Sequence, residues 1–311
     1  MQHLFDDIVR RRGGVSSRPR PAWAIVLAGG DGRRLEPVCR ARYGYPRPKQ
    51  YCAFGDDEPL LARTIRRALR RVPEDQVVVS TRRDHRAEAW ETLAPFRRVR
   101  VVEQPENRGT LPGLLLPLLG VLTSDPDATV LVLPSDHHIA DDGSFADYLG
   151  QATSAVAAHP ERVLLLGARL EDPEEGYGWI LPDRPRAQGP LRVTAFREKP
   201  PADEVPALIA QGALVNTFVM ACKARTLARL ARRRAPRWWS AACDGVFSPE
   251  SLTEHYERLP QIDFSRRVLE RHIGDLLVMP MQGVGWSDVG TPERLARSLE
   301  PAPERVAAPG A

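Results

Sequence analysis

The stretch that decides the fold is Ala24-Ile25-Val26-Leu27-Ala28-Gly29-Gly30-Asp31-Gly32-Arg33-Arg34-Leu35. It begins as an apolar run rich in branched residues, which predicts a buried strand. Three glycines in four positions then end the strand, and two arginines follow. Successive backbone N–H groups in such a turn form a concave anion site, and arginine adds bidentate donors that suit phosphate. The stretch therefore predicts a phosphate-binding loop at the carboxyl end of a first strand.

Two common phosphate-binding patterns do not describe this loop. The dinucleotide pattern G-x-G-x-x-G is matched by Gly30 and Gly32, but Leu35 stands where the third glycine belongs. The P-loop pattern needs a lysine after a matching glycine pair, and none follows here. A Rossmann dehydrogenase is therefore disfavoured. A glycine-rich turn that binds nothing remains an alternative at this point.

Composition limits the classes of function. The chain has 311 residues, of which 42% are hydrophobic, and this suits one large α/β domain or one domain with a small annex. A net charge of +4, without basic stretches that alternate with aromatics, argues against a nucleic-acid partner. The longest apolar run, 111–122, is shorter than the roughly 20 residues of a membrane helix. The four cysteines form no C-x-x-C pair, so we expect a reduced, cytoplasmic protein.

Lysine is rare in this chain. Arginine carries the positive charge except at Lys49, Lys199 and Lys223. Two of these lysines lie in Pro48-Lys49-Gln50 and Glu198-Lys199-Pro200. An ammonium group and a guanidinium group are not interchangeable where a point charge must reach one phosphate oxygen. Lys49 and Lys199 are therefore candidate phosphate ligands, with chance placement as the alternative.

The order of expected elements predicts the fold class. Strands and helices alternate up to residue 168, which indicates an α/β fold with a doubly wound parallel sheet and right-handed crossovers. We expect strands at 23–28, 77–80, 99–103, 129–134 and 163–168, and helices at 59–72, 85–93, 111–122 and 144–158. Residues 38–48 contain three arginines and two prolines and are interpreted as an irregular loop over the site.

Beyond residue 168 the regular alternation of expected strands and helices ends. Short extended segments are expected at 176–180, 191–198 and 214–221, then helices at 224–234, 238–246, 251–259 and 264–272, and a last strand at 276–279. We predict a basic leader (1–20), one domain (21–300) and a disordered tail (301–311). The domain divides into a nucleotide half, about 21–168, and a sugar-phosphate half with a small added β/helical part, about 169–300.

Two aspartates are candidate Mg²⁺ ligands. The glycine loop and Asp136 each follow a predicted parallel strand, so both lie at the carboxyl edge of the sheet, where ligands bind in such folds. A phosphate loop and a strand-end carboxylate together suggest Mg²⁺, which takes one or two carboxylates and completes its shell with water and phosphate oxygens. Asp288 lies in a Gly/Ser turn and is the second candidate. A helix N-cap for Asp136 and an Asx turn for Asp288 are the structural alternatives.

The glycine loop with Pro48-Lys49-Gln50 resembles the signature of the sugar-1-phosphate nucleotidylyltransferases. The resemblance extends from about Ala24 to Thr291 and is closest to the mannose-1-phosphate guanylyltransferase branch. It implies a Rossmann-like, mostly parallel fold of the GT-A-like nucleotide-diphospho-sugar transferase type. Seven further segments follow in the family's order: 104–110 (QPENRGT), 133–137 (LPSDH), 175–180 (EGYGWI), 198–200 (EKP), 216–218 (NTF), 262–265 (IDFS) and 285–290 (GWSDVG).

The resemblance implies nucleotidyl transfer from an NTP, with GTP as the best guess, to a hexose 1-phosphate, with mannose 1-phosphate as the best guess. It assigns the nucleotide to Leu27, Ala28, Gly29, Gly30, Gly32, Arg34, Lys49, Gln104 and Thr110. It assigns the sugar phosphate to Gly178, Glu198, Lys199 and Asn216, and Mg²⁺ to Asp136 and Asp288. The implied catalytic residues are Arg34, Lys49, Asp136, Lys199 and Asp288. His137 is interpreted as a brace for the Asp136 loop.

Several positions depart from the family pattern. Arg33 stands where a small residue is usual, segment 40–48 looks longer, and 109–113 and 215–218 differ at places that affect base and sugar selection. The additional C-terminal domain of some relatives has no counterpart, so we expect one activity. Two alternatives stay open: a related enzyme for another base or sugar, and a non-catalytic homologue that binds a nucleotide sugar as a regulator. The oligomeric state is also open, with a homodimer as one alternative.

Overall fold

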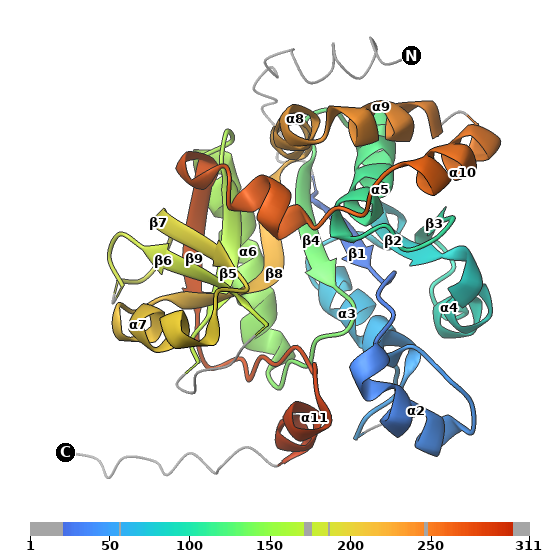
Figure 1. Cartoon of the computed structure of the whole chain (residues 1–311), viewed down its shortest axis with the longest axis horizontal. Coiled ribbons are helices and arrows are strands. Elements are labelled where there is room, and N and C mark those ends of the chain that lie inside the picture. Colours follow the sequence, from blue (N-terminus) through green and yellow to red (C-terminus); the bar gives the residue numbers. More distant parts are fainter. Residues whose placement is uncertain (1–20, 56, 171–175, 186, 246–247, 301–311) are drawn as a thin grey trace.

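The computed structural model describes residues 21–55, 57–170, 176–185, 187–245 and 248–300, so the predicted leader and tail lie outside the described residues. Within these ranges, nine strands form one sheet with the order β3-β2-β1-β4-β8-β5-β9-β7-β6 (Figure 1). The strands are β1 (Trp23–Leu27), β2 (Val77–Arg82), β3 (Arg100–Gln104), β4 (Thr129–Pro134), β5 (Val163–Ala168), β6 (Gly178–Pro182), β7 (Leu191–Glu198), β8 (Leu214–Lys223) and β9 (Leu276–Met281).

The part of the sheet formed by β3, β2, β1 and β4 is parallel, as predicted, whereas the pairings of β8, β7 and β6 are antiparallel. Strand β1 lies between β2 and β4 and is parallel to both, with Ile25 opposite Val78 and Val132. Strand β8 is antiparallel to both β4 and β5, so β5 points the same way as β4. Strand β9 is parallel to β5, whereas β7 is antiparallel to β9. The loops after β1 and β4 therefore meet at one carboxyl edge, beside the point where the chain order in the sheet reverses.

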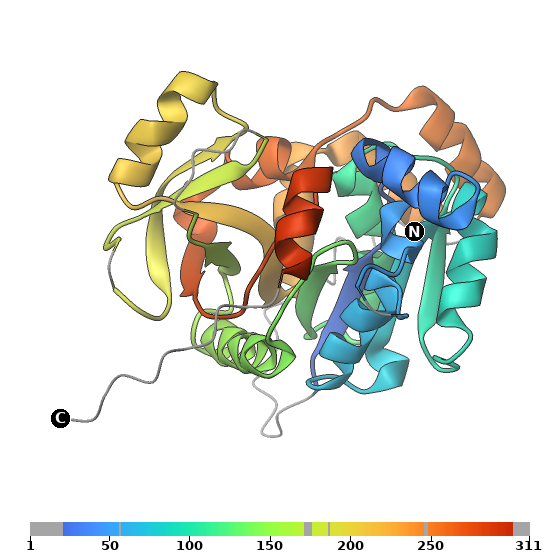
Figure 2. The same cartoon turned by 90° about the horizontal axis from the view of Figure 1, so that it is seen from below.

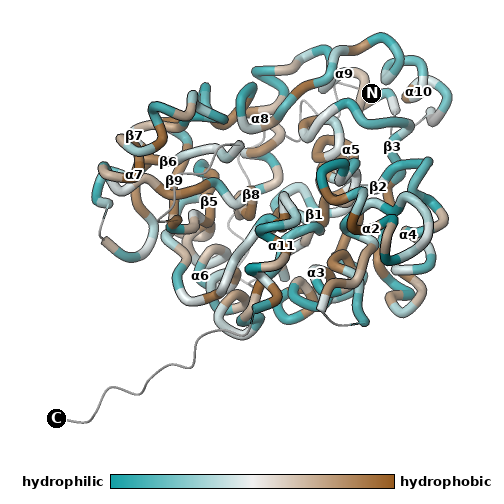
Figure 3. The backbone as a smooth tube through the Cα atoms, turned by 60° about the horizontal axis from the view of Figure 1, so that its bottom comes forward, coloured by the Kyte–Doolittle hydropathy of each residue, from teal (hydrophilic) through white to brown (hydrophobic). Residues whose placement is uncertain are grey.

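Helices cover both faces of the sheet because buried strand residues alternate between two cores. Ile25 packs in one core with α5 (Thr110–Ser124), α8 (Ala224–Arg234) and α9 (Pro236–Gly245). Its neighbours Ala24 and Val26 pack in the other core with α3 (Leu60–Leu69), α4 (Arg86–Leu93) and α6 (Asp142–Ala158). Figure 2 shows the helices on the two sides of the sheet, and Figure 3 shows apolar residues gathered in the central strands. The remaining helices are α2 (Glu36–Tyr43), α7 (Val205–Ala210), α10 (Pro249–Arg258) and α11 (Pro292–Leu299).

The structure corrects two expected elements. Most of segment 38–48, interpreted as an irregular loop, is helix α2, which has a proline in its first turn and ends at Gly44 in the left-handed region (φ 81°). Its arginines point outward, whereas Cys39 packs against Phe54 and Leu60. The expected helix at 264–272 is shorter, a π-helical segment at Ser265–Leu269. None of the described helices is both long and apolar enough to cross a membrane.

Candidate active site

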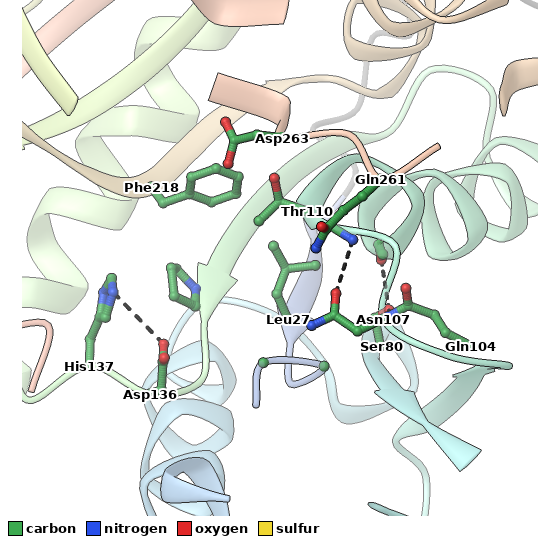
Figure 4. Close-up of a pocket in the computed structure, with 15 residues that line it drawn as sticks. Leu27, Ser80, Gln104, Asn107, Thr110, Asp136, His137, Phe218, Gln261 and Asp263 are labelled. Atoms are coloured by element: carbon green, nitrogen blue, oxygen red, sulfur yellow. Dashed lines mark hydrogen bonds and ion pairs between the residues drawn. The ribbon is translucent and has the colours of Figure 1, made fainter. Parts of the chain in front are cut away.

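A pocket of about 420 Å³ opens at the carboxyl ends of β1 and β4, in the size range of ligand sites. Gly29 and Gly30 of the glycine loop form part of its wall. Figure 4 shows Asp136 and His137 on one side, and Gln104 with Asn107 on the opposite side. The other residues that line it include Leu27, Ser80, Thr110, Phe218, Gln261 and Asp263. The structure thus brings the two predicted nucleotide-binding regions, 27–30 and 104–110, to one cavity.

The segment Pro48-Lys49-Gln50 fastens the glycine loop. The Gln50 amide nitrogen donates to the carbonyls of Ala28, at 3.0 Å, and Gly30, at 2.9 Å. Gly32 has a φ of 63°, and a Cβ on it would lie 2.9 Å from the Lys49 backbone nitrogen. Glycine is therefore required here both for the backbone conformation and for the close approach of the Lys49 segment.

A second hollow of about 300 Å³ lies on the other side of the glycine loop. Arg34, Lys49 and Asp136 all line it, and Asp136 also lines the first pocket. Arg34 is exposed. The side chain of Arg33 is 84% exposed, so the bulk that departs from the family pattern extends into solvent and does not fill the loop. Two hollows therefore adjoin at the Asp136 carboxylate.

An ion pair that the sequence did not reveal lies beneath the glycine loop. The buried guanidinium of Arg82, at the end of β2, pairs with Asp31 of the loop and with Asp84. Partial burial alone would raise the pKa of Asp31, but the hydrogen bond and charge of Arg82 outweigh it and lower that pKa. Asp31 is therefore ionised, and its ion pair with Arg82 anchors the glycine loop.

Lys49 joins three segments at the centre of the site. Its Nζ lies 3.1 Å from Asp136 Oδ2 and donates to the backbone carbonyls of Asp288, at 2.7 Å, and Val289, at 3.2 Å. The residue is only 9% exposed. Burial would raise the pKa of Asp136, but the Lys49 charge holds it below its usual value. These contacts place an ionised carboxylate beside a buried ammonium group.

His137 contacts the Asp136 loop, in agreement with its predicted bracing role. Its Nε2 lies 3.9 Å from Asp136 Oδ1, and its Nδ1 accepts a hydrogen bond from Trp286 Nε1 at 3.1 Å. The next residue, His138, exchanges backbone hydrogen bonds with Ser287. The loops 135–138 and 285–290 are thereby held together. Asp136 itself is not a helix N-cap, since Asp141 caps α6.

The carboxylate of Asp288 is surrounded by donors. Its Oδ1 accepts from the Tyr177 hydroxyl at 2.8 Å and from the Gly290 N–H at 3.0 Å. The Arg294 guanidinium lies 3.1 Å from Oδ1 and 3.0 Å from Oδ2. The contact with Gly290 is the Asx turn that the sequence left open as an alternative. Asp288 is therefore a turn anchor in this arrangement, and any metal ligation must share the carboxylate with Arg294.

The acidic groups suit a Mg²⁺ ion that arrives with a polyphosphate. Across the described part of the chain, no group of three or more His, Cys, Asp or Glu side chains is placed to hold a metal. Mg²⁺ needs no such cage, because one or two carboxylates with water and phosphate oxygens complete its shell. Asp136 lines both hollows, and its Oδ2 lies 3.1 Å from Lys49 Nζ. The donor set thus fits Mg²⁺ at Asp136, and less directly at Asp288.

The predicted sugar-phosphate residues also come together. Gly178 opens β6 and pairs in register with Glu198 at the end of β7. A Cβ at residue 178 would lie 2.5 Å from Glu198 Oε2 and 3.3 Å from the Asn216 Cβ, so glycine makes room for both side chains. The Asn216 amide donates to Ser265 Oγ at 3.3 Å. These residues form one cluster.

Glu198 and Lys199 differ sharply in burial. The Glu198 side chain is 8% exposed, and burial with the nearby charge of Asp263 raises the pKa of Glu198 to about 7. The Lys199 side chain is 54% exposed, and its Nζ lies 3.8 Å from Glu198 Oε1. Lys199 also has a φ of 51°, a left-handed conformation that costs a non-glycine residue of the order of 1–3 kcal/mol.

The far end of the first pocket holds a buried amide. The Gln104 Nε2 donates to Ser80 Oγ at 3.3 Å, and its Oε1 accepts from Tyr256 OH at 3.4 Å. Thr110 opens α5, and its Oγ1 accepts from the Phe264 N–H at 2.7 Å. Both predicted base- and ribose-side residues therefore line the pocket and are fixed by neighbours.

Sequence reasoning missed several residues of the site. Asn107, Phe218 and Asp263 lie in segments that carried the resemblance, so their motifs were the signal that could have found them. Arg82 and Arg294 lie in no motif, and only their contacts with Asp31 and Asp288 reveal them.

Comparison with known proteins agrees with this geometry. The nucleotidyl transferase family model matches residues 23–302. The chain is 29% identical over 295 residues to mannose-1-phosphate guanylyltransferase 2 of Escherichia coli O157:H7, covering 87% of this chain and 58% of the relative. It is 32% identical over 180 residues to the alginate biosynthesis protein AlgA of Pseudomonas syringae pv. tomato, covering 57% of this chain and 36% of the relative.

A solved structure extends the match to three dimensions. The mannose-1-phosphate geranyltransferase of Thermus thermophilus superposes with a TM-score of 0.79 at 29% identity. This superposition covers 92% of the present chain and 81% of the Thermus chain. The chain spans little more than half the length of its E. coli relative. The family model, which covers most of the described chain, shows that this chain belongs to the nucleotidyl transferase family.

Proposed function

We propose that this chain transfers a nucleotidyl group from GTP to mannose 1-phosphate, forming GDP-mannose and pyrophosphate. The observation that carries the proposal is the position of Asp136 between two adjoining hollows, with Lys49 bound to it. One hollow is large enough for a nucleoside, and the other is lined by Arg34 and Lys49, as an anionic leaving group requires. The names of the relatives favour GTP and mannose 1-phosphate.

The nucleotide would lie along the glycine loop. Gly29, Gly30 and Gly32 expose backbone to the phosphates, and Leu27 and Ala28 end the strand beneath them. Gln104 and Thr110 line the same pocket and would contact the base and the ribose. Arg34 and Lys49 neutralise the triphosphate and then the departing pyrophosphate. Mg²⁺, when bound at Asp136 with or without Asp288, supplies further charge neutralisation at the phosphates.

The sugar phosphate would occupy the cluster at the end of β7. Glu198 and Asn216 offer buried hydrogen-bonding groups for sugar hydroxyls, next to the space left by Gly178. Lys199 is exposed enough to meet the phosphate of the incoming sugar.

The chemistry needs positioning more than proton transfer. A phosphate oxygen of the sugar 1-phosphate attacks the α-phosphorus in line, the bond to the β-phosphate breaks, and pyrophosphate leaves with the electron pair. The nucleophile is already anionic, so no strong general base is required. The barrier comes from bringing two polyanions together, and Arg34, Lys49 and Lys199 lower it by fixed positive charge.

A pyrophosphate-release panel tests the proposal. It crosses GTP, ATP, UTP, CTP and dTTP with mannose, glucose, galactose and N-acetylglucosamine 1-phosphates, with Mg²⁺ or EDTA. We expect GTP with mannose 1-phosphate to dominate and EDTA to abolish the signal. We also expect Asp136→Ala to lower turnover roughly 10²–10³-fold, as for loss of one preorganised electrostatic group. A different winning pair would overturn the specificity, and silence from folded protein in every well would overturn the activity.

A further inference from the structure

Contacts with Thr291, Tyr177 and Asp288 fix the position of Arg294. Arg294 lies on α11. The side chain of the N-cap residue Thr291 accepts a hydrogen bond from the Arg294 backbone N–H at 3.3 Å. Its guanidinium lies over the Tyr177 ring, 4.5 Å from the ring centroid, and contacts both oxygens of Asp288. The two side chains are only 11% and 17% exposed. Such a shielded charge pair is much less screened than a surface ion pair.

The turn that carries Asp288 is built to hold this pair. Val289 has a φ of 47°, which is strained for a β-branched residue. Lys49 compensates by donating to the carbonyls of residues 288 and 289. A Cβ on Gly290 would lie 2.5 Å from Asp288 Oδ2 and 2.9 Å from an Arg294 guanidinium nitrogen. Only glycine at position 290 leaves room for the ion pair, so the pair and the turn fit one another.

We propose that Arg294 is an internal counter-ion that competes with Mg²⁺ for the Asp288 carboxylate and so sets the Mg²⁺ concentration that this enzyme requires. Tyr177 and the Gly290 N–H donate to Oδ1, and Arg294 contacts both oxygens. A cation can therefore coordinate Asp288 fully only if Arg294 gives way. Two cations that share one carboxylate are coupled, and each weakens the binding of the other by the same factor.

Arg294 can leave its carboxylate more readily than Lys49 can leave Asp136. The Lys49 ammonium also donates to two carbonyls, so its position does not depend on Asp136 alone. Arg294 has the Tyr177 ring as a second resting place, so it can leave the carboxylate without losing all contacts. The inference rests on the proposed function for the identity of the metal, but its test requires no turnover.

The experiment measures Mn²⁺ binding by the full chain without substrates, from the electron paramagnetic resonance signal of free Mn²⁺, with Mg²⁺ as competitor. Wild type is compared with Arg294→Met and with Arg297→Met, which removes an exposed arginine from the same helix. We expect Arg294→Met to bind Mn²⁺ roughly 5- to 30-fold more tightly, in the usual range of coupling between two ligands. Arg297→Met should bind as wild type does.

A merely structural Arg294 gives the opposite result. Loss of a turn anchor would weaken metal binding or leave it unchanged. Either outcome in folded Arg294→Met would overturn the proposal. Absence of Mn²⁺ binding to both wild type and Arg294→Met would overturn it as well. If Arg294→Met does not fold, Arg294→Gln decides, because it also removes the guanidinium charge from Asp288. Tighter Mn²⁺ binding than in wild type is expected, and unchanged or weaker binding would overturn the proposal.

The two proposals fail in distinguishable ways. Unchanged Mn²⁺ affinity in an enzyme that makes GDP-mannose would remove the role of Arg294 and leave the function. Tighter Mn²⁺ binding by Arg294→Met, in a protein silent in the pyrophosphate panel, would keep the competition between the two cations and remove the activity.

Discussion

The ammonium group of Lys49 lies 3.1 Å from the carboxylate of Asp136, and the same group donates to the backbone of residues 288 and 289. One side chain thus links the segment after the glycine loop, the end of β4 and the turn before α11. The ammonium group already contacts Asp136 and two backbone carbonyls, so a bound phosphate would have to share it with these partners. Its role is therefore both structural and electrostatic.

Replacement of Lys49 by methionine should lower turnover roughly 10²–10³-fold, because the change removes a preorganised positive charge beside Asp136. Lys49→Arg should not restore the rate, since a planar guanidinium cannot aim three donors from one atom. Steady-state pyrophosphate release measures both variants. Lys223→Met is the matched control, because Lys223 contacts the Asp127 carbonyl and Thr129 Oγ1 and lines neither hollow. Near-wild-type turnover in folded Lys49→Met would remove Lys49 from the mechanism.

Lys199→Gly should separate stability from activity. Glycine adopts the observed φ of 51° without strain and keeps the N–H that donates to the Tyr177 carbonyl at 3.0 Å. We expect the free energy of unfolding to stay equal or rise by up to about 1 kcal/mol, while turnover falls roughly 10²–10³-fold. Urea unfolding and initial rates measure the two effects, and Lys199→Arg should retain more activity than Lys199→Gly. A glycine variant as active as wild type would contradict the assigned role.

Glu198 should make folding stability depend on pH. The folded protein holds the Glu198 proton up to about pH 7, whereas the unfolded chain releases it near pH 4.5. The folded state therefore binds more protons between these values, so the free energy of unfolding falls as pH rises from about 4.5 to about 7. Relative to Glu198→Gln, wild type should lose roughly 2–3 kcal/mol over this window.

Urea unfolding at pH 4.5, 6 and 7.5 measures this difference. Glu204→Gln changes an exposed glutamate and is the matched control, which should follow the wild-type pH dependence. Parallel pH profiles for wild type and Glu198→Gln would show that Glu198 titrates alike in the folded and unfolded states, contrary to this expectation.

Gly109→Ala should destabilise the wall of the first pocket. Gly109 has a φ of 92°, and a Cβ there would lie 2.4 Å from the Ile262 carbonyl oxygen. Backbone strain and the clash together should lower the free energy of unfolding by about 2–4 kcal/mol and raise the KM for the NTP. Gly120→Ala is the control on the same helix region. A Cβ at Gly120 would meet no atom of the described residues within 4 Å, so this variant should be more stable than wild type by about 0.5–1 kcal/mol. Equal stability of the two variants would contradict the prediction.

Much of the fold could be predicted because its signals are local. The apolar run 24–28 and the glycines after it specify a strand and a turn through sterics and burial alone. Asp136 could be placed at the sheet edge because a strand precedes it directly. Helix α2 was missed because its arginines and flanking prolines resemble a loop, although Cys39 already faces a buried cluster. Composition outweighed periodicity in that interpretation.

The sequence by itself determined the α/β class, the glycine loop, the strand-end carboxylate and the family to which the chain belongs. These follow from short-range steric preferences, hydrophobic periodicity and motif order. Only the tertiary structure decided that Lys49 meets Asp136, that Arg82 neutralises Asp31 and that Arg294 holds Asp288. The first two pairs join segments distant in the chain, the third spans a turn and the start of a helix, and in all three the charge of a side chain does not say which opposite charge it will face. Their geometry depends on how strands and helices pack, because packing alone brings the two partners within hydrogen-bond distance and shields them from water.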